Sequence, residues 1–280
     1  MRRNILYAPR VQGDLDLGLE PTRIETTALA TTGKGLSRLI TPGGLLPGQS
    51  EQGVYEGSVT QKYRIGSRMV VDDRVFRYGK ATEALIRNMG ALNSASWPIN
   101  AATLTATTIA TSQIKVVEAT CSAGDYAGGY IVLFTSPLQI RRILGNDASD
   151  GTEAILYVDG AWELGGAIGT WATGYKSIFR AIQAPPAAAP NYVSFICVPL
   201  ISVTINYYFW GQTWGPCYGV ADGTVPGSAA NKRDLYFASS GNLEPYGDGA
   251  AGVGGQYAGY IIPTTSLGSG DQFYMLSLQP

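Results

Sequence analysis

The chain has 280 residues, of which 45% are apolar and 15% are charged, so it can bury a substantial core as one large β-domain or two ordinary domains. Residues 1–100 hold 13 Lys/Arg and 9 Asp/Glu, a balance of +4, and residues 101–280 hold 7 and 12, a balance of −5. This mild imbalance lacks the dense basic stripe that a nucleic-acid partner requires, so we expect no nucleic acid to bind.

The chain contains no histidine, which is the usual general base and metal ligand near neutral pH. Ser-His-Asp catalysis, Cys-His catalysis and most zinc sites are therefore excluded. The three cysteines, Cys121, Cys197 and Cys217, form no CxxC pair, and we expect buried free thiols in a reducing compartment. These observations predict a protein that is not an enzyme, with no catalytic residue, no cofactor and no metal.

The N-terminal sequence MRRNILYAPRVQGDLD lacks the apolar segment of a signal peptide. No run of residues approaches the ~20 apolar residues of a membrane span. We therefore expect synthesis in a cytoplasm and no membrane partner.

Residues 1–58 show no regular hydrophobic pattern, and Pro and Gly residues at positions 42–48 break any regular element. Apolar residues such as Ile5, Leu6 and Leu45 are too frequent for a solvated tail. We predict an extended arm that is ordered by docking on a neighbouring molecule. A locally folded loop is the alternative.

Residues 59–111 are predicted to form a small anchoring subdomain that begins with a β-hairpin. The segment QKYRIGSRMVVDDRVFRYGKA (61–81) carries six basic and two acidic side chains, with a tight turn at Asp72-Asp73. Strand alternation puts charge and apolar bulk on both faces of the second strand. One face holds Arg74, Phe76 and Tyr78, and the other holds Val75 and Arg77. Either both faces contact protein through guanidinium hydrogen bonds, or the Arg stems cover the edge of a core.

The segment ATEALIRNMGALN (81–93) is the best helical candidate. Its apolar residues recur at helical spacing, Glu83 and Arg87 form an i,i+4 pair, and Gly90 can end the helix. We predict one short helix here, which needs packing to persist.

Residues 112–280 are predicted to form a β-sandwich or barrel-like body. The segments that favour strands are rich in Val, Ile, Tyr, Phe and Thr, and Gly- and Asp-bearing turns separate them. These strand segments are IKVVEAT, GYIVLFT, LQIRRIL, EAILYVD, YVSFICVPLISVTINYYFW, DLYFA, GYIIPT and QFYMLSL. The sequence APPAAAP (184–190) predicts an extended spacer within this body.

The densest aromatic cluster is YYFWGQTWGPCYG (207–219). Tyr208, Trp210 and Trp214 favour a protein core or subunit interface, and a sugar-stacking platform is the alternative. The acids Asp125, Asp159, Glu163 and Asp222 could supply a glycosidase carboxylate pair, although each lies at or beside a turn, where acids are common. GNDASDGTE (145–153) favours a polar turn over a calcium loop, because it lacks the EF-hand spacing.

Several sequence blocks resemble the capsid-decoration, or cement, proteins of tailed bacteriophages. YRIGSRMVVDDRVFRYGKA resembles their Y-P-L-G-T-x-x-x-x-G-D-R-V-F-R-Y-x-K signature, except that Arg64 replaces Pro and Asp72 replaces Gly. YAGGYIVLFTSPLQIRRILGN (126–146), YYFWGQTWGPCYGVADGTV (207–225) and the closing GYIIPTTSLGSGDQFYMLSLQP resemble three further blocks, in the same order. Phe209 stands where those proteins have Gly, and residues 147–206 match no block.

This resemblance implies a structural, non-enzymatic virion protein on the capsid surface. It would bind the major capsid protein of a tailed phage, bridge capsid subunits and self-associate, with a trimer as the expected state. The candidate contacts with the capsid or with other subunits are Arg2, Arg3, Tyr7, Arg64, Arg68, Arg74 and Arg77.

Two other functions remain open at this point. The first is a glycan-binding tail-fibre or adhesin module that stacks sugars on Trp210 and Trp214. The second is a carboxylate-based glycan hydrolase on a virion.

Overall fold

The computed structural model describes residues 38–40, 45–94, 99–106, 108, 111–185, 193–222, 233–245, 255–262 and 272–279. For residues 38–40 it describes the backbone alone. The expectations for Arg2, Arg3 and Tyr7, for most of the arm, and for the centre of the APPAAAP spacer lie outside the described residues.

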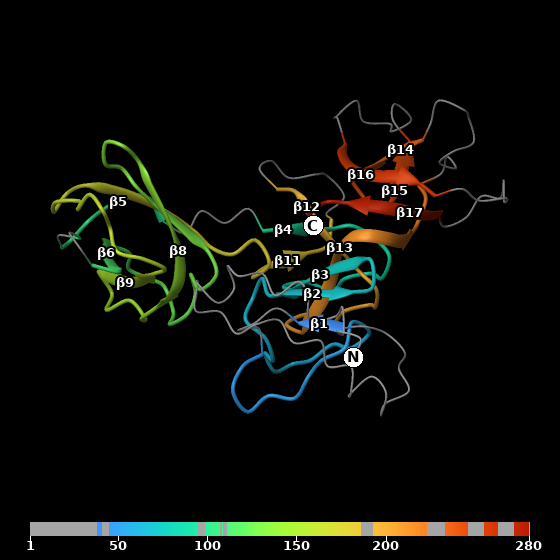
Figure 1. The fold of residues 1–280 in the computed structure, drawn as a ribbon, viewed down its shortest axis with the longest axis horizontal. Coiled ribbons are helices and arrows are strands. Elements are labelled where there is room, and N and C mark those ends of the chain that lie inside the picture. The colour runs from blue at the N-terminus through green and yellow to red at the C-terminus, as the bar shows by residue number, and fades with distance from the viewer. Residues whose placement is uncertain are drawn as a thin grey trace, which may run out of the picture. The chain divides into compact units, whose positions relative to one another are not determined.

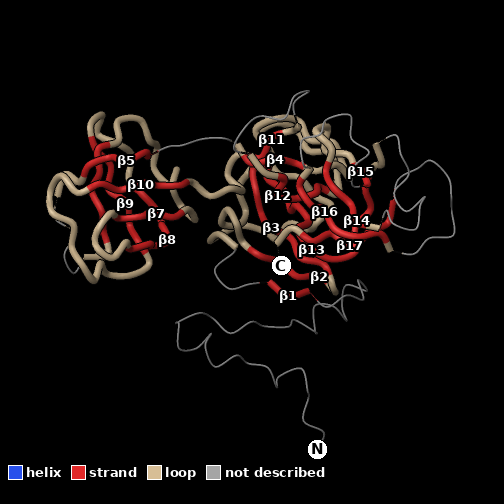
Figure 2. The backbone as a smooth tube through the Cα atoms, turned by 90° about the horizontal axis from the view of Figure 1, so that it is seen from above, coloured by secondary structure: helices blue, strands red, loops and turns tan. Residues whose placement is uncertain are grey.

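The described residues form an all-β protein, as predicted, and Figure 2 shows strands and loops throughout this part of the chain. The chain divides into two compact units, Met1–Ser94 with Ala181–Pro280 (unit 1) and Ala95–Arg180 (unit 2). The strands of unit 1 are β1 Arg38–Ile40, β2 Arg68–Val71, β3 Arg74–Lys80, β4 Ala91–Asn93, β11 Ile182–Gln183, β12 Phe195–Pro199, β13 Tyr208–Gly219, β14 Asp234–Phe237, β15 Leu243–Pro245, β16 Gln256–Ile261 and β17 Gln272–Ser277. The strands of unit 2 are β5 Ile99–Thr103, β6 Gln113–Val117, β7 Tyr130–Leu133, β8 Gln139–Asn146, β9 Glu153–Val158 and β10 Trp171–Tyr175.

Unit 1 is built on one curled antiparallel sheet in the order β1-β2-β3-β13-β17-β16-β14-β15. The long strand β13 pairs with β3 over its first half and with β17 over its second half. Figure 1 shows these three strands side by side, although they are far apart in the sequence. A side branch, β12-β4-β11, joins the sheet through β12.

The predicted hairpin is present as β2 and β3, which pair from Val71↔Arg74 to Arg68↔Arg77. Its two-residue turn has Asp72 at a φ of 55°. Asp adopts this left-handed conformation more readily than most residues, and Gly adopts it most readily of all. The turn also lies against β13, where a Cβ on Gly215 would come 2.3 Å from the carbonyl oxygen of Asp73. Only glycine therefore lets β13 pass the hairpin at this distance.

Unit 2 is a second curled antiparallel sheet in the order β5-β10-β7-β8-β9-β6. A bridge between Leu104 and Val116 brings its two ends together. The inner face buries a core of its own, which consists of Ile99, Leu104, Ile114, Val116, Cys121, Tyr126, Ile131, Leu133, Ile143, Ala154, Leu156, Val158, Trp162 and Ala172.

The prediction of a short helix over residues 81–93 is wrong. The backbone N–H groups of this segment donate to distant carbonyls instead of to the fourth residue back: Leu85 N donates to Val203 O (2.9 Å) and Gly90 N to Gly241 O (2.7 Å). Asn88 has a φ of 62°, which no right-handed helix contains. A helix this short is marginal without packing, and the long-range hydrogen bonds outcompete it.

The unit boundaries, at 94/95 and 180/181, differ from the sequence-based limits at 58 and 111. The reason is that β4, which precedes unit 2 in the sequence, pairs with β11, which follows it. Asn93 lies opposite Ile182, and Ser94 N donates to Ala181 O at 2.9 Å. The two ends of unit 2 therefore leave unit 1 from neighbouring positions on one pair of strands, like the ends of an extended hairpin loop.

We expect unit 1 to fold when residues 95–180 are replaced by a two-residue Asn-Gly turn. Ser94 and Ala181 already sit as the flanking pair of such a turn, and the core of unit 2 consists of its own residues. The variant should unfold cooperatively on heating and keep near-ultraviolet circular dichroism. A deletion that also removes β4 is the control, because it takes away the partner of β11 and β12 and should abolish cooperative unfolding. Loss of cooperative unfolding in the Asn-Gly variant would show that unit 1 does not fold without unit 2.

Candidate interaction surface

An aromatic cluster fastens the segment before the hairpin to the sheet of unit 1. Tyr63, Tyr78 and Trp210 are fully buried, and their rings meet edge to face with centroids 4.8–5.2 Å apart. They come from a loop, from β3 and from β13, so the cluster joins three separate parts of the chain. Burial raises the pKa of Tyr78 to about 12.

Gln52, also fully buried, supplies the polar centre of this cluster. Its backbone oxygen accepts from Trp210 Nε1 (2.9 Å), and its side-chain oxygen accepts from Tyr78 Oη (2.9 Å). Its Nε2 donates to the carbonyls of Glu56 (2.8 Å) and Tyr208 (2.9 Å). Because every polar group of this side chain is satisfied, the described segment from residue 45 is held against β13 without exposing an unpaired donor.

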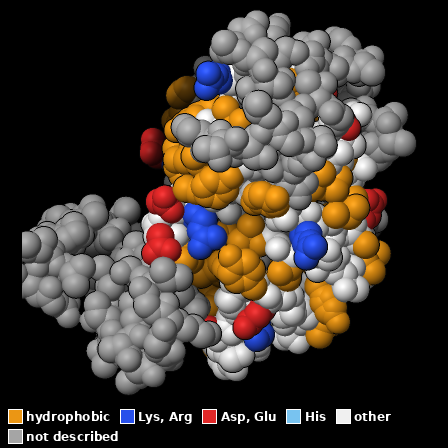
Figure 3. Space-filling view, turned by 90° about the vertical axis from the view of Figure 1, so that its right-hand side faces the viewer, with side chains coloured by type: hydrophobic (Ala, Val, Ile, Leu, Met, Phe, Trp, Pro, Cys, Tyr) orange, Lys and Arg blue, Asp and Glu red, His pale blue; other side chains and the backbone are white. Residues whose placement is uncertain are grey.

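The opposite face of the same sheet carries large apolar side chains toward solvent. Strand pairing aligns Tyr218 with Phe273, and it aligns Pro216, Met275 and Tyr260 in a second row. Tyr218, Phe273 and Tyr260 are 47–48% exposed, and Trp214 and Met275 are half-buried. We call Trp214, Tyr218, Tyr260, Phe273 and Met275 the outer face of unit 1. Figure 3 shows one face of the molecule, on which apolar side chains lie between single basic and acidic groups.

Two of the predicted contact arginines border this outer face. Arg68 and Arg77 are direct cross-strand partners on β2 and β3, on the same side of the sheet as Val75 and Trp214. Like charges placed opposite each other repel, and both arginines also interact with other groups of this chain. Both side chains are half-buried, and Arg77 Nη1 donates to Gly66 O at 3.4 Å.

The other two contact arginines lie elsewhere. Arg64 is exposed in the loop before β2. Arg74 projects from the opposite face of β3, with its guanidinium 5.7 Å from the ring centroid of Phe76. The structure therefore brings Arg68 and Arg77 together and separates them from Arg74, in agreement with the predicted alternation along β3.

The predicted aromatic residues of β13 have different environments. Trp210 is fully buried, so its indole ring cannot stack on a sugar. Trp214 is half-buried on the outer face, and Tyr208 stacks on Tyr78 at 6.0 Å with the Lys80 ammonium 5.8 Å from its ring centroid. The two-tryptophan platform of the glycan alternative is therefore not presented to solvent.

The three cysteines are buried and free of disulfides. Burial raises the pKa of each thiol, to about 12 for Cys217, so the thiol form predominates at neutral pH. A protonated, buried thiol is a poor nucleophile.

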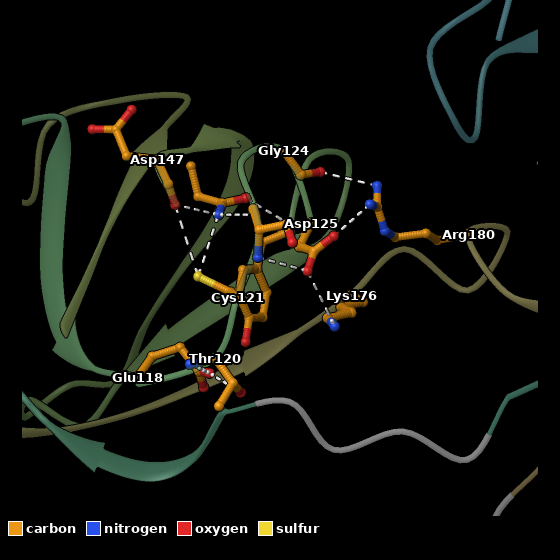
Figure 4. A network of polar contacts seen from close by, with 11 residues as sticks. Glu118, Thr120, Cys121, Gly124, Asp125, Asp147, Lys176 and Arg180 are labelled. Atoms are coloured by element: carbon orange, nitrogen blue, oxygen red, sulfur yellow. Dashed lines mark hydrogen bonds and ion pairs between the residues drawn. The ribbon is translucent and has the colours of Figure 1, made fainter. Parts of the chain in front are cut away.

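The candidate catalytic acids make local structural contacts. Asp125 binds Arg180 Nη2 (2.5 Å) and Lys176 Nζ (3.9 Å), and Figure 4 shows both cations converging on its carboxylate. Asp159 accepts from Arg142 N (3.1 Å), and Glu163 pairs with Arg141 (3.5 Å). Asp222, the fourth acid, belongs to unit 1.

Asp150, in the GNDASDGTE loop (145–153), accepts hydrogen bonds from the backbone N–H groups of Thr152 and Glu153. These two bonds lower the pKa of Asp150 and make the loop a polar turn. Within the described ranges, no three Cys, Asp or Glu side chains are grouped to hold a metal ion. No helix in the same ranges is long and apolar enough to span a lipid bilayer.

Sequence reasoning missed Gln52, Tyr260 and Phe273. Phe273 and Met275 alternate with buried neighbours in QFYMLSL, which signals a half-exposed strand. The alternation gave no indication that this strand lies beside β13. Gln52 lies in a segment without a hydrophobic periodicity, so no sequence signal marked it.

Comparison with models of known protein families, with curated proteins and with solved structures finds no match for this chain.

Replacing Gln52 with Ala should lower the free energy of unfolding by about 3 kcal/mol, because it removes three side-chain hydrogen bonds and leaves the buried Tyr78 hydroxyl without an acceptor for its proton. Chemical denaturation followed by tryptophan fluorescence measures the change. Gln61→Ala is the matched control, since Gln61 makes one local bond to Tyr63 O and should cost about 0.5 kcal/mol or less. Equal effects of the two changes would show that Gln52 does not hold this segment.

We expect the native protein to resist thiol reagents at pH 8. All three thiols are buried with raised pKa values, so the reactive thiolate is scarce below the pKa of each group and becomes abundant only above it. Titration with Ellman's reagent should show almost no reaction in the native state and three thiols in denaturant. Rapid labelling of the native protein would instead indicate an accessible, activated cysteine.

Proposed function

We propose that this protein is a structural virion component that binds the outside of a tailed-phage head and bridges capsid subunits. The observation that carries this proposal is the outer face of unit 1 with Arg68 and Arg77 at its border. Tyr, Trp, Phe, Met and Arg are the residue types enriched at protein interfaces, and buried Trp, Tyr and Arg contribute most of the binding energy there.

The positions of the sequence blocks that resemble decoration proteins also support the outer face as the docking surface. Three of them fall on β2–β3, on β13 and on β16–β17. These elements are distant in sequence but are neighbours in the sheet order β2-β3-β13-β17-β16. These three blocks therefore fall on the strands that carry the outer face and its bordering arginines, whereas the block at 126–146 falls on β7–β8 of unit 2.

In this function the arginine pair supplies charge and the aromatic side chains supply buried apolar area. Carboxylates on a capsid protein would add charge-assisted hydrogen bonds to the contacts that Arg68 and Arg77 make within the chain. Many identical copies on one shell add their contacts, so moderate affinity per copy suffices. The partner, the trimeric state and the location on the capsid come from the resemblance and are part of this proposal.

Co-sedimentation of the purified chain with empty phage heads tests the proposal. We expect binding to expanded heads and weaker binding to unexpanded ones. The double change Tyr218→Ala with Phe273→Ala, and separately Arg68→Ala, should each weaken binding at least about tenfold, the loss expected for an interface residue worth about 1.4 kcal/mol. Higher salt should weaken binding of the wild type more than binding of Arg68→Ala.

Arg87→Ala is the matched control, because Arg87 is an exposed arginine outside the outer face. It should bind heads as the wild type does. A wild-type chain that stays in the supernatant with both kinds of head would refute the proposed function. Equal losses for Arg68→Ala and Arg87→Ala would place the docking surface elsewhere.

A further inference from the structure

The outside of unit 2 carries an apolar surface that the proposed function does not use. Strand pairing arranges the outward residues of β10, β7 and β8 as three rows across the sheet. The rows are Trp171–Phe134–Leu138, Val132–Ile140 and Tyr175–Tyr130–Arg142, and Leu144 continues the pattern along β8. Their neighbours along the strands, such as Ala172, Leu133 and Ile143, are buried in the core, so this grid faces away from it. Phe134 directly follows β7 and Leu138 directly precedes β8, and Thr173, the partner of Val132 on β10, is buried.

The side chains of this grid are unusually exposed for apolar residues. Trp171, Phe134, Leu138, Ile140, Tyr175, Tyr130 and Leu144 are each 44–60% exposed. At roughly 200 Å² for a large side chain, these seven leave about 750 Å² of apolar side-chain surface in contact with water. The largest apolar patch on a typical monomer is about 300–600 Å². The value is instead close to the ~800 Å² that each partner contributes to a standard protein interface.

The residues of the grid are suited to contact with the same grid on a second copy of the chain. A two-fold interface brings the same patch of both copies together, so the patch has to complement itself. An apolar surface does so, whereas a charged surface meets its own charge. Arg142 is the one charged residue of the grid and lies opposite Tyr175 across the row.

A two-fold axis that runs along β7 exchanges the β10 and β8 columns of the grid. Arg142 then lies over the ring of Tyr175 from the second copy, which is a favourable cation–π arrangement. Trp171 lies against Leu138 of the second copy, and Val132 lies on the axis. We propose that the grid is a homotypic interface through which unit 2 joins two copies of this chain. This contact goes beyond head binding and does not depend on it.

Sedimentation velocity of the full-length chain without heads tests this interface. Ile140→Lys places a charge in the grid and should weaken self-association about a hundredfold, which halves the particle mass at micromolar concentration. The matched control is Val117→Lys, since Val117 is an exposed strand residue on β6, three strands from β7 in the sheet order. It should keep the wild-type mass. A monomeric wild type, or equal masses for the two variants, overturns the proposal.

A second variant keeps the test decisive if Ile140→Lys does not fold. Val132→Cys is nearly isosteric and lies on the proposed axis, so mild oxidation should give a disulfide-linked dimer on a non-reducing gel. Val117→Cys should stay a single chain under the same conditions, and the three native thiols are buried. Absence of a Val132→Cys dimer overturns the proposed axis. Head co-sedimentation of Ile140→Lys separates the two proposals, because failure of one leaves the other measurable.

Discussion

The pairing of β13 along its whole length is the constraint on which the rest of unit 1 depends. Residues Tyr208–Trp214 pair with β3 and residues Trp214–Gly219 pair with β17, so one strand joins segments that are about two hundred residues apart in sequence. The buried Gln52 and its aromatic neighbours then add a polar link from a loop to the same strand. Every surface that we assign to unit 1 is positioned by these pairings, because they decide which side chains face the core.

The two ends of β13 have different surroundings, and this difference separates buried aromatic residues from those of the proposed docking face. At its start, residues before the hairpin cover the strand and bury Trp210 completely. Beyond the bulge between Gln212 and Trp214, the outward side chains remain partly or largely exposed, as Trp214 and Tyr218 do. Both tryptophans lie in one aromatic run of sequence, and their roles differ because their neighbours come from elsewhere in the chain.

Sequence alone predicted the all-β class, the β2–β3 hairpin, and strands with clear alternation such as Glu153–Val158 and Gln272–Ser277. It missed β10, whose sequence WATGY has little β-branched bulk. It assigned a helix to residues 81–93 because local spacing cannot show that distant carbonyls accept their hydrogen bonds. Of the candidate surface, the placement of Arg77 on the opposite face from Arg74 follows from alternation along one strand and was predicted, whereas Phe273 and Tyr260 depend on non-local pairing and were not.

Unit 2 is inserted between two sequence segments of unit 1, and each of the two proposed surfaces lies on a unit with its own core. Because β4 and β11 pair directly, unit 1 closes its sheet with its own residues, and changes on the outside of unit 2 cost it no core packing. In the proposed arrangement, mutations could alter head binding through unit 1 and self-association through unit 2 separately. The two contacts would also reinforce each other, since a copy held by its neighbour would be at high effective concentration over its docking surface. A stabilising layer can thus be built from contacts that are each weak enough to form reversibly during assembly.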